Sequence, residues 1–178
     1  SDKLIAGEHF TQSCNANCEE LIKEIINNPL TYPVTITYTI TPWIGECEGT
    51  PVSVTLTVNP SAQVNELDNL VFCHGNHSDG VNFTTDRIEG ITTYTWTIDN
   101  EDIWDLGLSG NGHIPKFIVI NTTNSLVTRN IEVHPFYTNN DVTCQGESIV
   151  FAITVNPLGQ VNKPDNQVVC HDDLTEVN

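Results

Sequence analysis

Hydrophobic and polar residues alternate with a period of two along residues 34–41, 52–58 and 149–155. In the first of these segments valine, isoleucine and tyrosine occupy one face and threonine the other, a pattern typical of strands that bury one side. Prolines at 42, 60 and 157 follow the three segments, and proline ends a ladder because it has no N–H to donate. The pattern predicts antiparallel sheets that face each other across a shared core.

Residues 91–99 alternate in the same way, with Tyr94, Trp96 and Ile98 on one face and three threonines on the other. An inward tryptophan on a central strand is typical of an immunoglobulin-like β-sandwich. We therefore expect all-β modules of this class rather than a tryptophan that serves as a ligand platform. The predicted core comprises Tyr94, Trp96, Ile98, Phe151, Ile153 and Val155.

Residues 17–26 fit two interpretations. Leu21, Ile22, Ile25 and Ile26 have helical spacing behind acidic residues, which favours a short amphipathic helix. Residues 25–42 also align with residues 119–135, where a strand is expected, and this alignment favours a strand over residues 21–26.

A segment of 28 residues occurs twice, at residues 47–74 and 144–171, with 14 identical positions and an offset of 97. A period near 100 fits a β-sandwich module better than a short solenoid repeat. We expect the C-terminal part of one module at 1–60, a complete module at 61–157 and the start of a third at 158–178. On this interpretation the sequence is a piece of a longer tandem array.

Charge excludes some classes of partner. The chain has 6 Lys and Arg against 23 Asp and Glu, a net charge of −17, which repels nucleic acid and anionic membrane surfaces. We also find no apolar run long enough to span a bilayer, so direct membrane insertion is not expected.

The six cysteines suit structural disulfides in an oxidising, extracellular compartment. Cys73 and Cys144 lie at strand borders of the same copy. A disulfide between them would close a loop of 71 residues and stabilise the folded state by about 4 kcal/mol. Cys47 would then pair with Cys14 or Cys18, and Cys170 with a residue beyond the end. The alternative is a bond between neighbouring copies, such as Cys47 with Cys73.

Candidate metal sites are weak. Residues 73–79 hold a cysteine, two histidines and an aspartate, but a cysteine in a disulfide offers zinc no thiolate. The acidic turn with Asp99, Glu101, Asp102 and Asp105 could supply oxygen ligands to calcium, although solvated acidic loops are the more ordinary interpretation. We therefore expect no obligatory cofactor, with calcium as the one candidate.

No catalytic arrangement is recognisable, so we do not expect an enzyme. Ser109 lacks the Gly-x-Ser-x-Gly frame of a nucleophile elbow, and no acid pair stands out among the carboxylates. Trp104 follows the core strand within the acidic turn. If exposed it would be the candidate for stacking on a sugar or a partner protein, and otherwise it would tuck under the sandwich edge.

Several further motifs stand out: Tyr94-Thr95-Trp96-Thr97, residues 110–115 (GNGHIP), Pro135, Cys144-Gln145-Gly146, Thr154-Val155-Asn156-Pro157 and Val168-Val169-Cys170. Together they resemble the PKD-like, immunoglobulin-like repeats of giant cell-surface proteins from Bacteroidota. The resemblance covers about residues 25–178. The resemblance implies export by type IX secretion and a place on the cell surface. It also implies a role as an adhesin, a class that includes the adhesins used in gliding motility.

The expected function is that of a non-catalytic stalk segment in an exported adhesin. Short Asn-Pro linkers restrain the backbone between modules, which favours a semi-rigid array. Neighbouring repeats are the expected partners, together with outer-membrane secretion or motility proteins or surface polysaccharide. The alternatives are a carbohydrate-binding accessory module of a secreted polysaccharide-processing protein and an anchoring segment held by an envelope partner.

Overall fold

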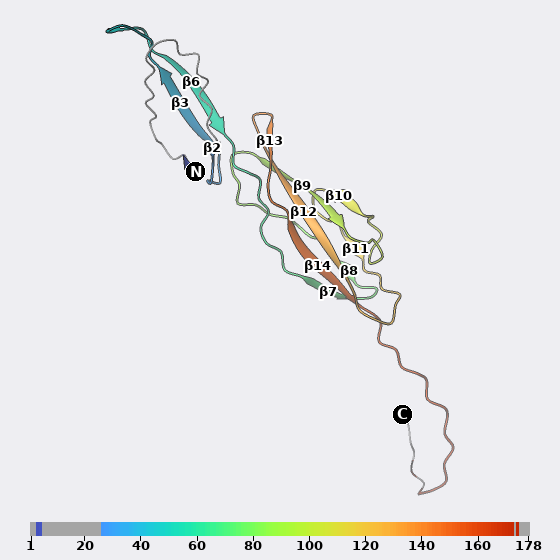
Figure 1. Ribbon diagram of the computed structural model, residues 1–178. Helices are drawn as coiled ribbons and strands as arrows, with labels where there is room; N and C mark the ends of the chain where they lie inside the picture. Colours follow the sequence, from blue (N-terminus) through green and yellow to red (C-terminus); the bar gives the residue numbers. More distant parts are fainter. Residues whose placement is uncertain (1–2, 5–25, 173, 175–178) are drawn as a thin grey trace.

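The structure is a computed structural model that describes residues 3–4, 26–172 and 174. Figure 1 shows an elongated molecule in which a long hairpin, a two-layered body and an extended tail follow one another along one axis. All regular secondary structure in the described residues is β, as the alternating pattern predicts, and the fold class is confirmed. None of the described residues forms a helix that could cross a membrane.

The body is built on one large sheet. Its strands are β7 (Leu70–Cys73), β9 (Ile91–Ile98), β10 (Ser109–Asn111), β12 (Val127–Asn139), β13 (Val142–Gln145) and β14 (Ile149–Asn156). Their order is β10-β9-β12-β14-β7, and β13 pairs with the end of β12. The 13-residue β12 lies at the centre and pairs antiparallel with β9, β13 and β14.

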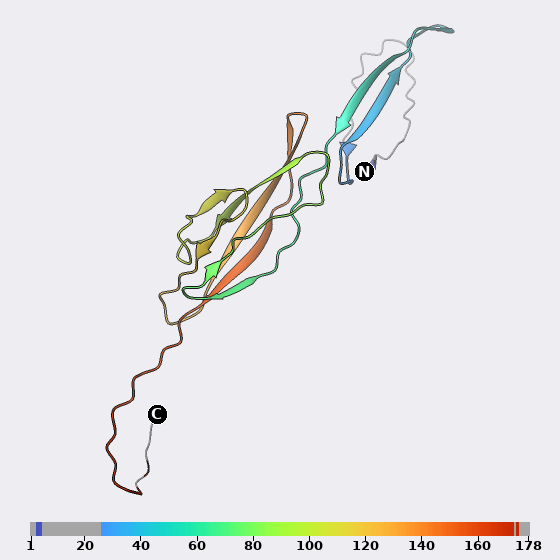
Figure 2. The same cartoon turned by 180° about the vertical axis from the view of Figure 1, so that it is seen from behind.

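A thinner second layer covers one face of this sheet (Figure 2). It consists of β8 (His77–Ser78) paired with β11 (Phe117–Ile118), a bridge between Val81 and Ile114, and extended chain on either side of them. The core lies between the layers. The six residues expected there, Tyr94, Trp96, Ile98, Phe151, Ile153 and Val155, have exposed fractions of 0–6%.

The large sheet is mixed, whereas the alternation led us to expect antiparallel strands only. β7 runs parallel to β14, with Leu70 opposite Ile153 and Cys73 opposite Asn156. The reason lies in the tandem arrangement: the chain enters the body at one end and leaves at the other (Figure 1), so its first and last strands point the same way.

The hairpin that precedes the body has the same strand pairing as the second half of the body. It comprises β3 (Val34–Ile40) and β6 (Val52–Val58), with a small extension of β4 (Trp43–Ile44) and β5 (Cys47–Glu48); β1 (Lys3–Leu4) pairs parallel with β2 (Ile26–Asn27). Val34 lies opposite Val58 as Val127 lies opposite Val155. β3 lies 93 residues before the equivalent part of β12, and β6 lies 97 residues before β14. The two pairs of strands therefore share the same register. Of the strand expected at residues 21–26, only Ile26 falls within the described residues, and it lies in β2.

The predicted bond between Cys73 and Cys144 is wrong. Cys73 lies opposite Asn156, at the far end of β14, whereas Cys144 pairs with Tyr137, beyond the other end of that strand. At about 3.3 Å per residue the two sulfurs are separated by more than about 20 Å, so both are free thiols. Cys47 is free at the outer tip of the hairpin, which also excludes the alternative bond to Cys73. Cys14 and Cys18 lie outside the described residues.

Candidate functional site: the junction between hairpin and body

The chain passes from the hairpin to the body through Asn59 and Pro60, and two asparagines lock this passage. The Asn59 amide donates to the backbone carbonyl of Asn139 at 3.2 Å, and the Asn139 amide donates back to Asn59 Oδ1 at 2.9 Å. Pro60 is fully buried beside them. The contact joins residues 80 positions apart, so the junction is held by side chains as well as by the covalent chain.

Asn139 reaches Asn59 because the hairpin of β12 and β13 projects beyond the sheet. Its turn residues Asn140 and Asp141 have φ of 49° and 60°, the left-handed conformations that a two-residue type I′ turn requires. Asparagine and aspartate tolerate this conformation better than other residues with side chains. The turn therefore directs the tip of the hairpin towards the preceding unit.

A second contact joins the loop before β9 to the base of the hairpin. The Arg87 guanidinium donates to the carbonyl of Leu30 at 2.8 Å, and the Ile88 N–H donates to the carbonyl of Thr31 at 2.9 Å. The hydroxyl of the fully buried Tyr137 donates to the Ile88 carbonyl at 2.9 Å. Burial, reinforced by the charge of Glu89, raises the pKa of this hydroxyl above its usual value, so it stays a donor at neutral pH.

Two glycines allow the close packing around these contacts. A Cβ on Gly146 would lie 1.9 Å from the carbonyl oxygen of Ala62, and one on Gly90 would lie 2.3 Å from the Tyr137 ring. Gly146 also donates to the carbonyl of Pro135 at 3.1 Å, as Gly49 does to Pro42 at 2.8 Å in the hairpin. The same local bond thus fixes the projecting turn in both copies.

A groove of about 400 Å³ lies where the hairpin meets the body. The end of β6 and the following Asn59 line the groove together with Ile26. The β12–β13 hairpin lines it with Asn139, Asn140, Val142 and Cys144. The groove is therefore bounded by two consecutive units of the repeat.

One asparagine in each unit clamps a loop to the end of the last strand. The Asn121 amide donates to the carbonyls of Ser125 and Val155, both at 2.8 Å, while its Oδ1 accepts from the Thr123 N–H at 2.9 Å. Asn28 makes the same three bonds to Tyr32, Val58 and Leu30. Because both asparagines are buried, these bonds satisfy groups that would otherwise be costly to bury.

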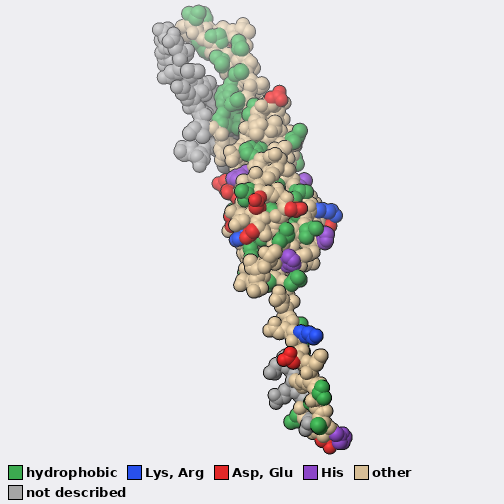
Figure 3. All heavy atoms as spheres, turned by 90° about the vertical axis from the view of Figure 1, so that its right-hand side faces the viewer, with side chains coloured by type: hydrophobic (Ala, Val, Ile, Leu, Met, Phe, Trp, Pro, Cys, Tyr) green, Lys and Arg blue, Asp and Glu red, His purple; other side chains and the backbone are tan. Residues whose placement is uncertain are grey.

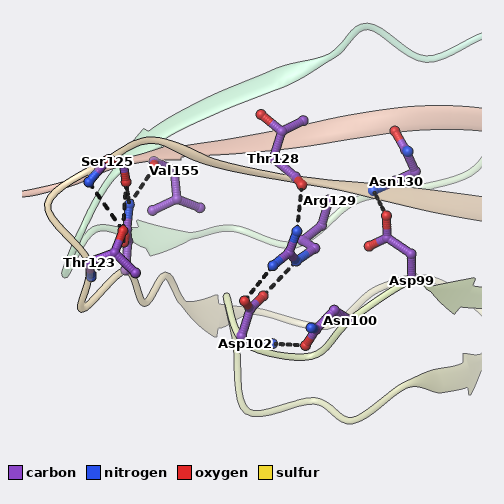
Figure 4. Close-up of polar contacts among 10 residues, drawn as sticks. Asp99, Asn100, Asp102, Thr123, Ser125, Thr128, Arg129, Asn130 and Val155 are labelled. Carbon is purple, nitrogen blue, oxygen red and sulfur yellow. Dashed lines mark hydrogen bonds and ion pairs between the residues drawn. The ribbon is translucent and has the colours of Figure 1, made fainter.

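The acidic turn forms an ion pair rather than a cluster. Both carboxylate oxygens of Asp102 accept hydrogen bonds from the Arg129 guanidinium, and the bond from Arg129 Nε to Asp102 Oδ1 is 2.7 Å long (Figure 4). Asp99 accepts from the Asn130 N–H at 3.3 Å. Arg129 lowers the pKa of Asp102, chiefly through the hydrogen bond. Among the described residues no group of three or more His, Cys, Asp or Glu is placed to hold a metal ion. Calcium binding by Asp99, Glu101, Asp102 and Asp105 stays a prediction from the sequence.

Trp104 is not an exposed ligand platform. Its exposed fraction is 4%, and its ring packs edge-on against Trp96 and Phe117 with centroids 5.5 and 5.1 Å away. Its Nε1 donates to the carbonyl of Gly107 at 3.0 Å. Of the two interpretations of Trp104, the structure shows burial under the sandwich edge, because two aromatic rings and a backbone acceptor surround the side chain.

The Cys-His segment at the far end of the body is a structural turn. The His74 N–H donates to the Asn156 carbonyl at 2.9 Å, and His74 Nδ1 accepts from the Asn121 N–H at 2.8 Å. Asn76 Oδ1 accepts from the Cys73 N–H at 2.9 Å. These bonds give the His74 imidazole and the Asn76 side chain a structural role in this turn.

Sequence reasoning missed the junction contacts. Asn59 recurs as Asn156, and this repetition was a signal, but nothing in the pattern connected it to Asn139. Arg87 and Tyr137 lie outside the 28-residue repeated segment. Their roles follow from the three-dimensional approach of the loop before β9.

Comparison with known families supports the interpretation of the first unit. A family described as the PKD-like domain matches residues 2–62, including the opening residues that the motifs above left out. PKD-like domains are immunoglobulin-like modules that typically occur in extracellular proteins and are generally non-catalytic. No curated protein matches the chain. Residues 26–58 of the matched segment share their register and their asparagine clamp with residues 119–155 of the body.

Proposed function

We propose that this chain is a load-bearing spacer, a segment of a tandem stalk that holds a surface adhesin away from the cell. The observation that carries the proposal is the junction, where Asn59 and Asn139 bond reciprocally and Arg87 joins the body to the hairpin. A linker held by side chains from both units transmits force and orientation, whereas a flexible linker transmits neither.

The strand order suits a module under tension. Force enters at Asn59 and leaves at Asn156, so it pulls β7 and the parallel β14 in opposite directions along their own axes. Hydrogen bonds between strands loaded in this way resist together, because none can break before its neighbours are also strained. The buried asparagine clamp adds a bond from Asn121 to Val155, near the point where force leaves.

The surface favours a solvated stalk. A net charge of −17 makes neighbouring stalks repel one another and opposes collapse onto anionic cell surfaces. In this proposal the chain is not an enzyme and needs no cofactor to bear load. Its partners are the neighbouring repeats, with outer-membrane secretion or motility proteins at the ends of the array.

The PKD-like match and the resemblance to Bacteroidota repeats support an extracellular place for the module. We extend this to export by type IX secretion and to surface attachment or gliding motility. The alternative, a carbohydrate-binding module, relied on Trp104 as the exposed ring that would stack on a sugar, and Trp104 is buried.

Stretching single molecules tests the proposal. With handles at Ser61 and Leu158, which bracket the body, we expect it to unfold in one step that releases roughly 300 Å of chain for 97 residues. Asn121→Ala, which removes the clamp, should lower the unfolding force, while Thr122→Ala on the exposed face of the same loop should not. Gradual extension at low force with no discrete step would contradict a load-bearing role.

A further inference from the structure

The junction lies within a motif of seven residues, Asn-Pro-x-x-Gln-Val-Asn, which occurs at residues 59–65 and again at 156–162. Its first two residues form the passage from the hairpin to the body. In the first occurrence Val64 is buried at 5%, whereas Gln63 and Asn65 are half-buried. The Gln63 amide donates to Asn65 Oδ1 at 2.7 Å, so the two side chains lie side by side and form an amide pair just past the junction.

The amide pair, Gln63 and Asn65, binds the loop before β9. Gln63 Oε1 accepts from the Thr85 hydroxyl at 3.1 Å and from the Asp86 N–H at 3.0 Å. The Asn65 amide donates to the Thr84 hydroxyl at 3.0 Å and to the Asp86 carboxylate at 3.2 Å, and the Asn65 N–H donates to the Thr84 carbonyl at 2.8 Å. This part of the loop belongs to no strand, so these bonds rather than a regular ladder fix its path.

The next two residues of the same loop make the contact with the hairpin. The Arg87 guanidinium bonds to the carbonyl of Leu30, and the Ile88 N–H bonds to the carbonyl of Thr31. The Thr85 hydroxyl, which donates to the amide pair, also accepts from the Arg87 N–H at 3.1 Å. A continuous series of hydrogen bonds therefore runs from the amide pair through Thr85 to the contact with the hairpin.

Arg87 depends on its loop for its position. Its Nε is buried without a hydrogen-bond partner in the described part of the chain, and none of the ion pairs among the described residues includes it. Figure 3 shows mostly hydrophobic and uncharged side chains over the hairpin, while most charged side chains lie on the body and the tail. A backbone carbonyl accepts only over a short distance and a limited range of angles, so Arg87 reaches Leu30 only where the loop is correctly placed.

We propose that Gln63 and Asn65 are positioning residues of the junction, because they hold the loop before β9 where Arg87 and Ile88 reach the hairpin. The stiffness of the joint then depends on two side chains whose own hydrogen bonds, among the described residues, lie within the body. The recurrence of the motif with the same spacing is expected if this device belongs to the repeated unit. The inference rests on the proposed function and deepens it, since it names residues that control the stiffness of the spacer.

Amide hydrogen exchange of the full chain, followed by NMR, tests the proposal. The Ile88 N–H reports the contact with the hairpin, and the Ile98 N–H, which is bonded at 3.0 Å within the body, is the internal reference. We expect Gln63→Ala and Asn65→Ala each to speed exchange at Ile88 about tenfold relative to Ile98, because the loop opens locally while the body stays folded.

Asn69→Ala is the matched control. It removes an amide from the same segment of the chain, but Asn69 Oδ1 accepts from the Ala152 N–H of β14 at 2.8 Å rather than from the loop. This variant should leave exchange at Ile88 relative to Ile98 unchanged. Equal acceleration by Asn69→Ala and Asn65→Ala would mean that Ile88 exchanges through a general loosening of the body, and would overturn the proposal.

Thr85 supplies a second readout. Thr85→Val keeps the size of the side chain but removes the hydroxyl, so it should speed exchange at Ile88, whereas Thr85→Ser keeps the hydroxyl and should behave like the wild type. Equal behaviour of these two variants would reject the path through Thr85. An Ile88 amide that is unprotected in the wild type would contradict the spacer proposal as well. A protected Ile88 amide that is unaffected by Gln63→Ala and Asn65→Ala would overturn this inference alone.

Discussion

β6 and β14 show how the same pattern behaves with and without partners. Both strands alternate apolar and polar residues, end in Thr-Val-Asn-Pro and pair in equivalent register with the preceding strand. β14 lies between β12 and β7 beneath a second layer, and the side chains on its inner face are buried. In the described residues β6 has one neighbouring strand, and nearly all of its side chains are exposed. Alternation therefore specifies a strand and its faces, while burial depends on the elements that cover it.

Two tryptophans give the strongest test of this difference. Trp96 is 3% exposed in the body and Trp43 is 58% exposed in the hairpin. We expect Trp96→Ala to lower the free energy of unfolding by about 3–5 kcal/mol, because it leaves a cavity under the sheet. Trp43→Ala should change it by less than about 1 kcal/mol. Urea denaturation followed by circular dichroism measures both, and similar losses would mean that the body has no separate core.

The repeat also offers a matched pair on the two equivalent strands. Ile153→Ala removes a fully buried side chain and should cost about 2–5 kcal/mol. Leu56→Ala, at the equivalent position of β6, should cost less than about 1 kcal/mol, since Leu56 is already 41% exposed. Thermal unfolding of the two variants provides the comparison. If Leu56→Ala were as harmful as Ile153→Ala, β6 would be covered in solution.

The smallest expected effect concerns the ion pair of the body. Arg129 holds the folded-state pKa of Asp102 below its unfolded value of about 3.9, so the pair stabilises the fold above that pH and the gain is lost as pH falls through the lower value. The side chains of Arg129 and Asp102 are 25% and 45% exposed, which limits the gain to under about 1 kcal/mol.

Unfolding curves of wild type and Asp102→Asn should therefore differ at pH 6 and converge below pH 3. Asp68→Asn, which removes an exposed carboxylate outside the ion pairs of the described residues, is the control. A difference between wild type and Asp102→Asn that persisted at pH 2 would assign the effect to packing rather than charge.

Much of the fold was predictable because it follows from local pattern. The alternation located β3, β6, β9 and β14, and the aromatic face of β9 identified the core. The parallel pairing of β7 was not predictable, since it depends on where the chain enters and leaves the body. For the same reason the cysteine positions were misjudged: Cys73 and Cys144 border strands of one copy but lie at opposite ends of the sheet.

The junction could be placed at Asn59-Pro60 from the repeated motif, but its stiffness could not. Asn59 meets Asn139 only because a type I′ turn directs the β12–β13 hairpin backwards, and Arg87 meets Leu30 through a loop with no regular pattern. For Trp104 the sequence left both exposure and burial open, and packing against Trp96 and Phe117 decides for burial.

A distance measurement across the junction tests most directly whether side chains couple the two units. Spin labels attached through azide-bearing residues at Thr37 and Thr128, both exposed, leave the native cysteines in place. Double electron–electron resonance should give one narrow distance distribution that broadens in Asn139→Ala, while Asn124→Ala, on an exposed loop, leaves it unchanged. A broad distribution in the wild type, unaffected by Asn139→Ala, would contradict a rigid junction and with it the account of this chain as a spacer.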